Sequence, residues 1–204
     1  MKQYRTIVAD PPWPLMAGPK AFQTRKPTRA HGIDLNPRYA ATTRPLAYAT
    51  MTLDEIAALP VAHLASPDAH LYLWTVNRHL EATYDIARAW GFTPSTLLTW
   101  CKEPRGIGLG GTFTLASEWV LFCRRGSLKA NQRIDRNWWQ WRRPPRHSEK
   151  PEAFLDLVEQ ISPGPYVELF ARRARFGWDY WGDESLGTAA LDKARYVAEA
   201  GKRA

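Results

Sequence analysis

Cysteine is scarce in this chain. Among 204 residues there are two, Cys101 and Cys123, and both lie in strand-like runs. This usage indicates reduced, structural thiols and excludes a disulfide-stapled scaffold. The five histidines follow no metal-ligand spacing, so we predict no zinc or other metal site.

Long apolar segments are also missing. The N-terminus carries no apolar signal segment, and no run reaches the length needed to cross a membrane. We therefore expect a cytoplasmic protein with no membrane partner. The chain has no evident internal repeat, and its length suits one domain with a good core. We expect that domain at 1–185, followed by a helical or disordered tail at 186–204.

Positive charge and tryptophan are both abundant. The formal net charge is +8, the sequence pI is about 9.7, and there are ten tryptophans. A basic chain favours a polyanionic partner, although many basic proteins bind nothing anionic. The tryptophans exceed what a core requires, so we expect some of them to form stacking surfaces.

Strand and helix patterns alternate along the chain, which predicts an α/β domain with a mostly parallel central sheet flanked by helices. The expected strands cover residues 7–9, 70–75, 95–101, 118–123, 166–170 and 176–181. The expected helices cover residues 52–59, 78–90 and 150–161. Segments 14–50 and 102–116 lack a period and are expected to be mobile substrate loops. The interval between the last two strands is too short for a helical crossover, so their pairing is left open.

The most informative run is Asp10-Pro11-Pro12-Trp13, directly after the first expected strand. The Asp10 carboxylate and the Pro11 carbonyl can each accept a hydrogen bond from an amino group, and Trp13 offers a ring for stacking. The prolines stiffen the turn. A strand that merely ends in a proline turn is the alternative. Its position favours a site, because ligands of open α/β sheets bind at the carboxyl ends of strands.

This run resembles the signature of the N6-adenine methyltransferases, in the bacterial and phage branch related to the eukaryotic mRNA adenosine methyltransferase. Three further segments match in order: 99–102 (Thr-Trp-Cys-Lys), 147–152 (His-Ser-Glu-Lys-Pro-Glu) and 168–173 (Glu-Leu-Phe-Ala-Arg-Arg). The resemblance runs from about residue 4 to residue 185. It implies a Rossmann-like domain in permuted motif order, with the catalytic strand first and the cofactor strand last.

The resemblance also implies S-adenosyl-L-methionine as cofactor, although a Gly-x-Gly fingerprint after a strand is absent. In the family the segment of Phe170 and Arg172 lines the adenosine and ribose pocket, and the lysine matching Lys150 contacts the cofactor carboxylate. Asp10 joins them as a cofactor candidate. The alternatives are a core role for Phe170 and a solvated side chain for Lys150. A lysine at a helix start opposes the helix dipole, which indicates another reason for its presence.

Further cofactor candidates lie near the end of the expected domain. Asp183 and Glu184 follow the last expected strand, where an acidic side chain often binds ribose hydroxyls. The family often has Asn at the position of Asp183. The polar His and Asn of the related mRNA enzyme are replaced here by Ala174 and Arg175, so part of the ribose contact differs. We retain Arg175 as a candidate.

Segment 133–146 interleaves arginines with tryptophans, as a single-stranded nucleic-acid site would require. The alternative is a partly buried strand with a solvated arginine rim. The glycine-containing loop after Lys102, and the arginines between 25 and 44, could form further walls. The expected substrate-binding residues are Trp13, Tyr39, Lys102, Arg105, Arg142, Arg143 and Arg146.

The motifs together predict methyl transfer to the N6 amine of adenine in DNA, with Asp10, Pro11, Pro12 and Trp13 as the catalytic group. Preference for DNA over RNA rests on the resemblance to the bacterial and phage branch. RNA adenosine and cytosine N4 stay open as substrates. A catalytically silent nucleic-acid-binding subunit also stays open, although such a subunit need not keep Asp10. Nucleic acid is the expected partner, and the chain could form a homodimer.

Overall fold

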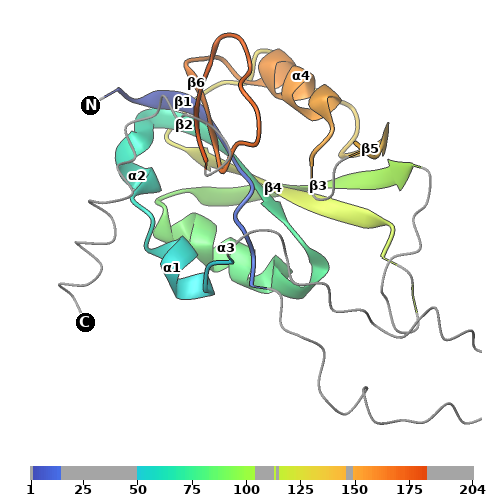
Figure 1. Ribbon diagram of the computed structural model, residues 1–204. Coiled ribbons are helices and arrows are strands. Elements are labelled where there is room, and N and C mark those ends of the chain that lie inside the picture. Colours follow the sequence, from blue (N-terminus) through green and yellow to red (C-terminus); the bar gives the residue numbers. More distant parts are fainter. Residues whose placement is uncertain (1, 15–49, 104–112, 114, 146–148, 183–204) are drawn as a thin grey trace, which may run out of the picture.

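The computed structural model describes residues 2–14, 50–103, 113, 115–145 and 149–182 (Figure 1). Their strands form one seven-stranded sheet in the order β5-β3-β4-β2-β1-β6-β7. The strands are β1 (Tyr4–Ala9), β2 (Ala65–Thr75), β3 (Thr93–Glu103), β4 (Ser117–Arg125), β5 (Trp138–Arg142), β6 (Tyr166–Leu169) and β7 (Trp178–Trp181).

The sheet is mostly parallel, as expected from the alternating pattern. Strand β1 pairs in parallel with β2 and β6, β3 with β5, and β6 with β7. Strand β4 is antiparallel to both of its neighbours, β2 and β3. The expected α/β class, with a mostly parallel sheet between helices, is therefore confirmed.

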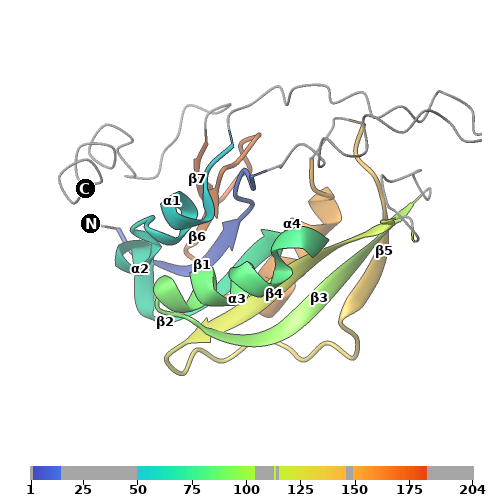
Figure 2. The same ribbon diagram turned by 90° about the horizontal axis from the view of Figure 1, so that it is seen from below.

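Helices cover both faces of the sheet (Figures 1 and 2). They are α1 (Leu53–Ala57), α2 (Val61–Leu64), the 3-10 turn η3 (Asn77–His79), α3 (Leu80–Ala89) and α4 (Glu152–Ile161). Helices α1 and α3 lie on one face, and α4 lies alone on the other. None of the helices in the described ranges is long and apolar enough to cross a membrane.

Alternation along the strands builds a separate core on each face. In β2, Leu71 and Leu73 belong to the core beneath α1 and α3, whereas Tyr72 and Trp74 belong to the core beneath α4. Strand β4 repeats this pattern, with Leu121 on the α3 side. All five side chains are at most 1% exposed, so the central strands are buried on both faces.

Local sequence explains where the shorter elements begin and end. Thr52 and Glu55 form the capping box that their spacing indicated: the Glu55 backbone N–H donates to the Thr52 hydroxyl at 3.2 Å, and the Thr52 backbone N–H donates to the Glu55 carboxylate at 2.7 Å. Helix α3 gives way to Gly91, whose φ of +80° suits a residue without a Cβ. The expected helix at 78–90 is thus η3 followed by α3.

The pairing of the last two strands, β6 and β7, was left open by the sequence and is seen in the structure. Strands β6 and β7 are parallel neighbours, with Tyr166 opposite Trp178 and Leu169 opposite Trp181. The connection 170–177 contains no helix. Segment 133–146 contains β5 at the sheet edge, in line with the alternative of a partly buried strand.

Leu121 gives a direct test of this core. It lies in the centre of β4 and is 0% exposed, so Leu121→Ala should lower the free energy of unfolding by about 2–5 kcal/mol. Leu115→Ala is the matched control, because Leu115 is 44% exposed, and it should change stability by about 0.5 kcal/mol or less. Urea denaturation measures both. Equal effects for the two variants would contradict the placement of β4.

Candidate active site

The carboxyl ends of the parallel strands bring four charged side chains together at one sheet edge. Asp10 follows β1, Lys102 lies near the end of β3, and Lys150 precedes α4. Glu118 joins them because β4 runs in the opposite direction and therefore begins at this edge. Strand β1 lies between β2 and β6, where the chain order changes direction, and open α/β sheets bind ligands at such a point.

Ion pairs join these side chains into a chain of alternating charge. The Lys150 Nζ lies 2.8 Å from the Asp10 Oδ2 and 3.4 Å from the Glu118 Oε2. The other Glu118 carboxylate oxygen pairs with Lys102. All four side chains are between 16% and 19% exposed. The Lys150 ammonium also lies 5.1 Å from the centre of the Trp74 ring, which adds a cation–π contact.

Burial and charge act in opposite directions on these groups. Burial raises the pKa of Asp10 above its ordinary value, and the Lys150 ammonium opposes that increase. Burial alone would raise the pKa of Glu118, but Lys150 and Lys102 outweigh it and lower that pKa. Burial would likewise lower the pKa of Lys150, but Asp10 and Glu118 outweigh it, so the pKa is raised and the lysine stays charged.

The Pro11-Pro12 turn is anchored at both of its carbonyls. The Trp13 N–H donates to the Pro11 carbonyl at 2.8 Å, and the Met51 N–H donates to the Pro12 carbonyl at 2.9 Å. A carbonyl oxygen has two lone pairs, so Pro11 can still accept a hydrogen bond from a ligand. The backbone of Asp10 is tied to β6 through its N–H and the Leu169 carbonyl at 3.4 Å.

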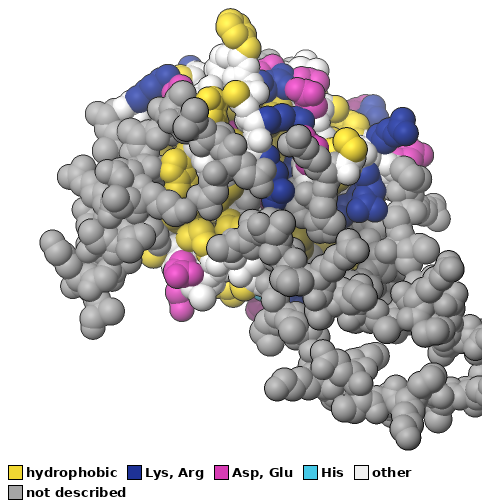
Figure 3. Space-filling view, viewed as in Figure 1, with side chains coloured by type: hydrophobic (Ala, Val, Ile, Leu, Met, Phe, Trp, Pro, Cys, Tyr) yellow, Lys and Arg dark blue, Asp and Glu magenta, His cyan; other side chains and the backbone are white. Residues whose placement is uncertain are grey.

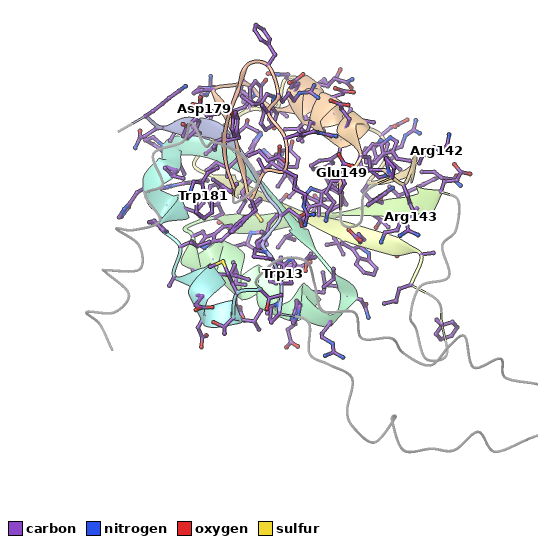
Figure 4. All side chains as sticks on the ribbon, in the orientation of Figure 1. Trp13, Arg142, Arg143, Glu149, Asp179 and Trp181 are labelled. Atoms are coloured by element: carbon purple, nitrogen blue, oxygen red, sulfur yellow. The ribbon has the colours of Figure 1, made fainter. Side chains whose placement is uncertain are left out.

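Trp13 lies in the core on the α1 and α3 side of the sheet (Figure 4). Its ring is 5% exposed, stacks on His79 with centroids 5.5 Å apart, and donates from Nε1 to the Trp74 carbonyl at 3.1 Å. The ring therefore holds the turn in place. Its expected stacking on a substrate base stays a prediction, and in this structure His79 lies where a base could stack.

A pocket adjoins Asp10 at the same edge. Its cavity is small, with a volume of about 30 Å³. The lining carries both signs of charge and includes three of the expected cofactor residues besides Asp10. The residues around it are Asp10, Trp74, Glu149, Lys150, Pro151, Phe154, Leu155, Glu168, Phe170, Arg172 and Arg173. The structure thus brings Lys150, Phe170 and Arg172 to the same pocket as Asp10.

Phe170 has an unusual backbone conformation at this pocket. Its φ is +64°, the only positive φ among the described residues other than glycine. A positive φ is energetically unfavourable for a residue with a bulky side chain, and such strain is concentrated at functional sites. The backbone around it is held tightly, since the Ala171 N–H donates to the Trp181 carbonyl at 3.0 Å. A Cβ on Gly182 would come within 2.3 Å of the Ala171 carbonyl, so only glycine fits there.

Glu168 is a site residue that the sequence did not single out. It lies in β6 on the pocket wall, where burial and then the nearby Asp10 carboxylate raise its pKa to about 7. Glu118 was missed in the same way. The available signal was a glutamate inside or at the start of an apolar strand, as in 166–170 and 118–123.

Arg175 was expected to contact the cofactor but does not line the pocket. Its guanidinium lies 2.6 Å from Asp156 and 2.9 Å from Glu159, both on α4. Trp178 donates to the same Glu159 carboxylate at 2.7 Å. In this structure Arg175 fastens the β6–β7 connection to α4, and a cofactor contact stays a prediction.

The expected nucleic-acid wall contains β5. Trp139 and Trp141 stack on each other with centroids 5.6 Å apart and pack against the core beneath α4. Trp138 on the other face of the strand is 54% exposed. Arg142 and Arg143 lie together at the carboxyl end of β5 (Figure 4). The segment therefore combines a partly buried strand with an exposed aromatic and basic rim.

Other expected residues fall elsewhere. Tyr39, Arg105, Arg146, Asp183 and Glu184 lie outside the described residues. In the part of the chain that is described, no three His, Cys, Asp or Glu side chains are placed to hold a metal ion. Basic side chains gather in the middle of the visible face, beside α4 (Figure 3).

The mostly parallel seven-stranded sheet flanked by helices is that of a Rossmann-like methyltransferase domain. The chain belongs to the MT-A70 family, which it matches over residues 4–184, so the resemblance noted from the four motifs is confirmed.

Individual relatives differ in length and source. The chain is 30% identical over 188 residues to the Type II methyltransferase M.MunI of Mycoplasma sp., covering 90% of this chain and 78% of the relative. It is 28% identical over 208 residues to a probable N(6)-adenosine-methyltransferase MT-A70-like protein of Oryza sativa subsp. japonica, covering 96% of this chain but 25% of that protein. It is 27% identical over 212 residues to the human N(6)-adenine-specific methyltransferase METTL4, with coverages of 94% and 39%.

The raised pKa of Glu168 predicts a pH-dependent stability. The folded protein keeps this proton up to about pH 7, whereas the unfolded chain loses it near the ordinary value of 4.5. Folding therefore binds a proton between these values, and the contribution of Glu168 to stability falls as the pH rises through this window.

In the wild-type protein, the free energy of unfolding should fall between pH 5 and pH 8. In Glu168→Gln this fall should be smaller by on the order of 1 kcal/mol or more. Urea denaturation at both pH values measures it. Glu81→Gln, at an exposed position of α3, should keep the wild-type dependence. A wild-type dependence in Glu168→Gln would contradict the raised pKa.

Proposed function

We propose that this protein transfers a methyl group from S-adenosylmethionine to the N6 amine of adenine in DNA. The observation that supports it most is the position of the Asp10 carboxylate in the lining of a mixed-charge pocket at the carboxyl edge of the sheet, with the Pro11 carbonyl next to it in the chain. The type of reaction follows the family, and the substrate and cofactor are our inference.

The charges of the pocket suit the cofactor. The amino-acid end of S-adenosylmethionine is a zwitterion, so it needs a carboxylate for its ammonium and a cation for its carboxylate. Asp10 supplies the first, and Lys150 and Arg172 supply the second. Phe170 supplies an apolar surface beside them. When bound, the cofactor supplies an electrophilic methyl group on sulfur.

The acceptors suit an aromatic amine. Asp10 and the second lone pair of the Pro11 carbonyl would each accept one N–H, which draws the nitrogen lone pair out of conjugation with the ring and turns it toward an electrophile. Burial raises the pKa of Asp10, so its carboxylate accepts hydrogen bonds more strongly than a solvated one. The main contribution of the enzyme is thus orientation within a preset field. The base must lie outside a duplex stack to reach this edge.

The relatives favour DNA without excluding RNA. The Type II methyltransferase M.MunI matches over most of its own length, whereas the rice adenosine methyltransferase matches over a quarter of its length. The net charge of +8 and the exposed rim of β5 favour a polyanion of either kind. Mass spectrometry of nucleosides from DNA and RNA incubated with the protein and labelled cofactor decides between N6-methyladenine, N6-methyladenosine and N4-methylcytosine.

Asp10 provides the decisive variant. Asp10→Ala should reduce methylation at least a hundredfold, because it removes the only charged acceptor of the turn, and should leave S-adenosylmethionine affinity within about tenfold, since Lys150, Phe170 and Arg172 remain. Asp85→Ala, at an exposed position of α3, is the control and should keep full activity. Methyl incorporation and calorimetry measure the two effects.

Two outcomes would contradict the assignment. Activity above about a tenth of wild type in Asp10→Ala, a loss under about 1.4 kcal/mol of transition-state stabilisation, would remove Asp10 from its role. Failure of the wild-type protein to bind S-adenosylmethionine would support the catalytically silent subunit instead.

The arginines at the end of β5 predict a salt effect. If Arg142 and Arg143 contact phosphates, their joint replacement by Gln should make the slope of log affinity against log salt less steep by about 1–2. Each phosphate contact that is lost reduces the number of counterions released when DNA binds. The apparent KM for DNA should rise, while cofactor affinity stays the same. The control pair Arg88→Gln/Lys129→Gln removes the same charge from other exposed positions. An unchanged slope in the β5 variant would exclude these contacts.

A further inference from the structure

A second and larger cavity lies on the α4 side of the sheet. Its volume is about 390 Å³, within the range of about 300–1,000 Å³ typical of small-molecule sites. It is formed by the middle of strands β2, β3 and β4, the start of β5, the end of α4 and the connection 126–137. The residues around it are Tyr72, Thr96, Leu98, Phe122, Arg124, Ala130, Gln132, Arg133, Ile134, Arg136, Asn137, Trp139 and Ile161.

This cavity is separate from the pocket at Asp10. The two share no lining residue. They lie toward opposite ends of α4, since Phe154 lines the first and Ile161 lines the second. An aromatic wall stands between them: Trp139 stacks on Trp141, and the Trp141 ring contacts Phe154 with centroids 6.3 Å apart. A ligand in the second cavity therefore does not compete with one beside Asp10.

The inner wall of the second cavity is aromatic and apolar. Tyr72 and Phe122 contact each other with ring centroids 5.0 Å apart, and Leu98 and Trp139 flank them. Tyr72 is 0% exposed, and its hydroxyl is already satisfied by the Ser162 hydroxyl at 2.8 Å. The surface that a ligand can reach is therefore supplied by Phe122, Leu98 and Trp139, which line the cavity and are partly exposed, and it is suited to a flat apolar group.

The rim of the cavity is basic. Arg124, Arg133 and Arg136 line it, and no carboxylate belongs to the lining among the described residues. Arg136 pairs with Asp135 at 3.3 Å. Within the described part of the chain, Arg124 and Arg133 form no ion pair, and the Arg124 guanidinium lies 5.2 Å from the centre of the Phe122 ring. Arg124 thus lies over the Phe122 ring, Arg133 lines the same cavity, and both are available to an anion.

We propose that this second cavity is a nucleotide-binding site, with the base against Phe122 and Trp139 and the phosphate on Arg124 and Arg133. A nucleotide joins a flat ring to an anion at short range, and the cavity places ring faces and guanidinium groups in the same relation. The site goes beyond the proposed function because it lies outside the catalytic edge and its occupancy requires no methyl transfer.

The same chemistry has two sources, a free nucleotide or one nucleotide of a longer strand. Strand β5 begins at Trp138, next to the cavity residue Asn137, and ends at Arg142 on the catalytic edge. Its five residues span roughly 16 Å, a length that a few nucleotides can follow. A single strand lying along β5 would therefore reach the cavity with a base several positions away from the one beside Asp10.

Binding experiments on the full chain test the site. Calorimetry with deoxyadenosine monophosphate probes the free nucleotide, and anisotropy of a fluorescein-labelled single-stranded DNA probes the strand. The double variant Arg124→Gln/Arg133→Gln should lower the affinity for at least one of these probes tenfold or more. Ala130→Phe should do the same, because it fills the cavity while every charge is kept. Arg5→Gln/Arg88→Gln removes the same charge at exposed positions away from the cavity and should stay within twofold of wild type.

The outcomes distinguish a free nucleotide from a nucleic-acid strand as the ligand, and they distinguish failure of this site from failure of the proposed function. Loss of nucleotide binding in both cavity variants identifies a free-nucleotide site, and loss confined to the DNA probe identifies a strand site. Binding of both probes that equals wild type in both variants would overturn the proposal, as would inorganic phosphate binding as tightly as the nucleotide. Cavity-dependent binding by a protein that methylates nothing would leave this site standing while the proposed function fails.

Discussion

The pairing of Lys150 with Asp10 and Glu118 is the constraint on which this structure depends. Two carboxylates lie together at one edge of a largely buried sheet, and such groups are stable as anions only when a cation reaches both. Removing one partner of a buried pair typically costs about 3–5 kcal/mol, because the remaining charge has no water to solvate it. The lysine thereby joins β1, β4 and the start of α4, and a cofactor that takes hold of Lys150 must also rearrange the partners of Asp10.

Local sequence patterns were enough to predict the architecture, but they predicted only part of the site. Apolar runs bounded by turn residues gave β2, β4 and β6, and the spacing of Thr52 and Glu55 gave the start of α1. The Asp10 turn could be placed at a carboxyl edge because strand ends are visible in a sequence. Glu118 could not, because its presence there depends on the antiparallel direction of β4. That direction is set by pairing with distant strands.

Side-chain orientation was the second limit. A tryptophan in a proline turn can face a ligand or the core, and only packing against α1 and α3 places Trp13 against His79. Arg175 shows the same limit, since its partners Asp156 and Glu159 are set by the position of α4. Lys150, Phe170 and Arg172 do meet Asp10 in one pocket. Their place near the cofactor site was predicted from the family resemblance more than from the chemistry of the residues, and their roles stay predictions.

The reversed direction of β4 has an evolutionary consequence. Strand β3 ends and β4 begins at the catalytic edge, so the connection between them joins two strand ends that lie beside Lys102 and Glu118. Connections of this kind accept insertions and deletions far more readily than strands do. A change in the length of this one connection would therefore be made at the catalytic edge while every strand keeps its register. Proteins sharing this sheet could diversify the targets they accept there at little cost to folding.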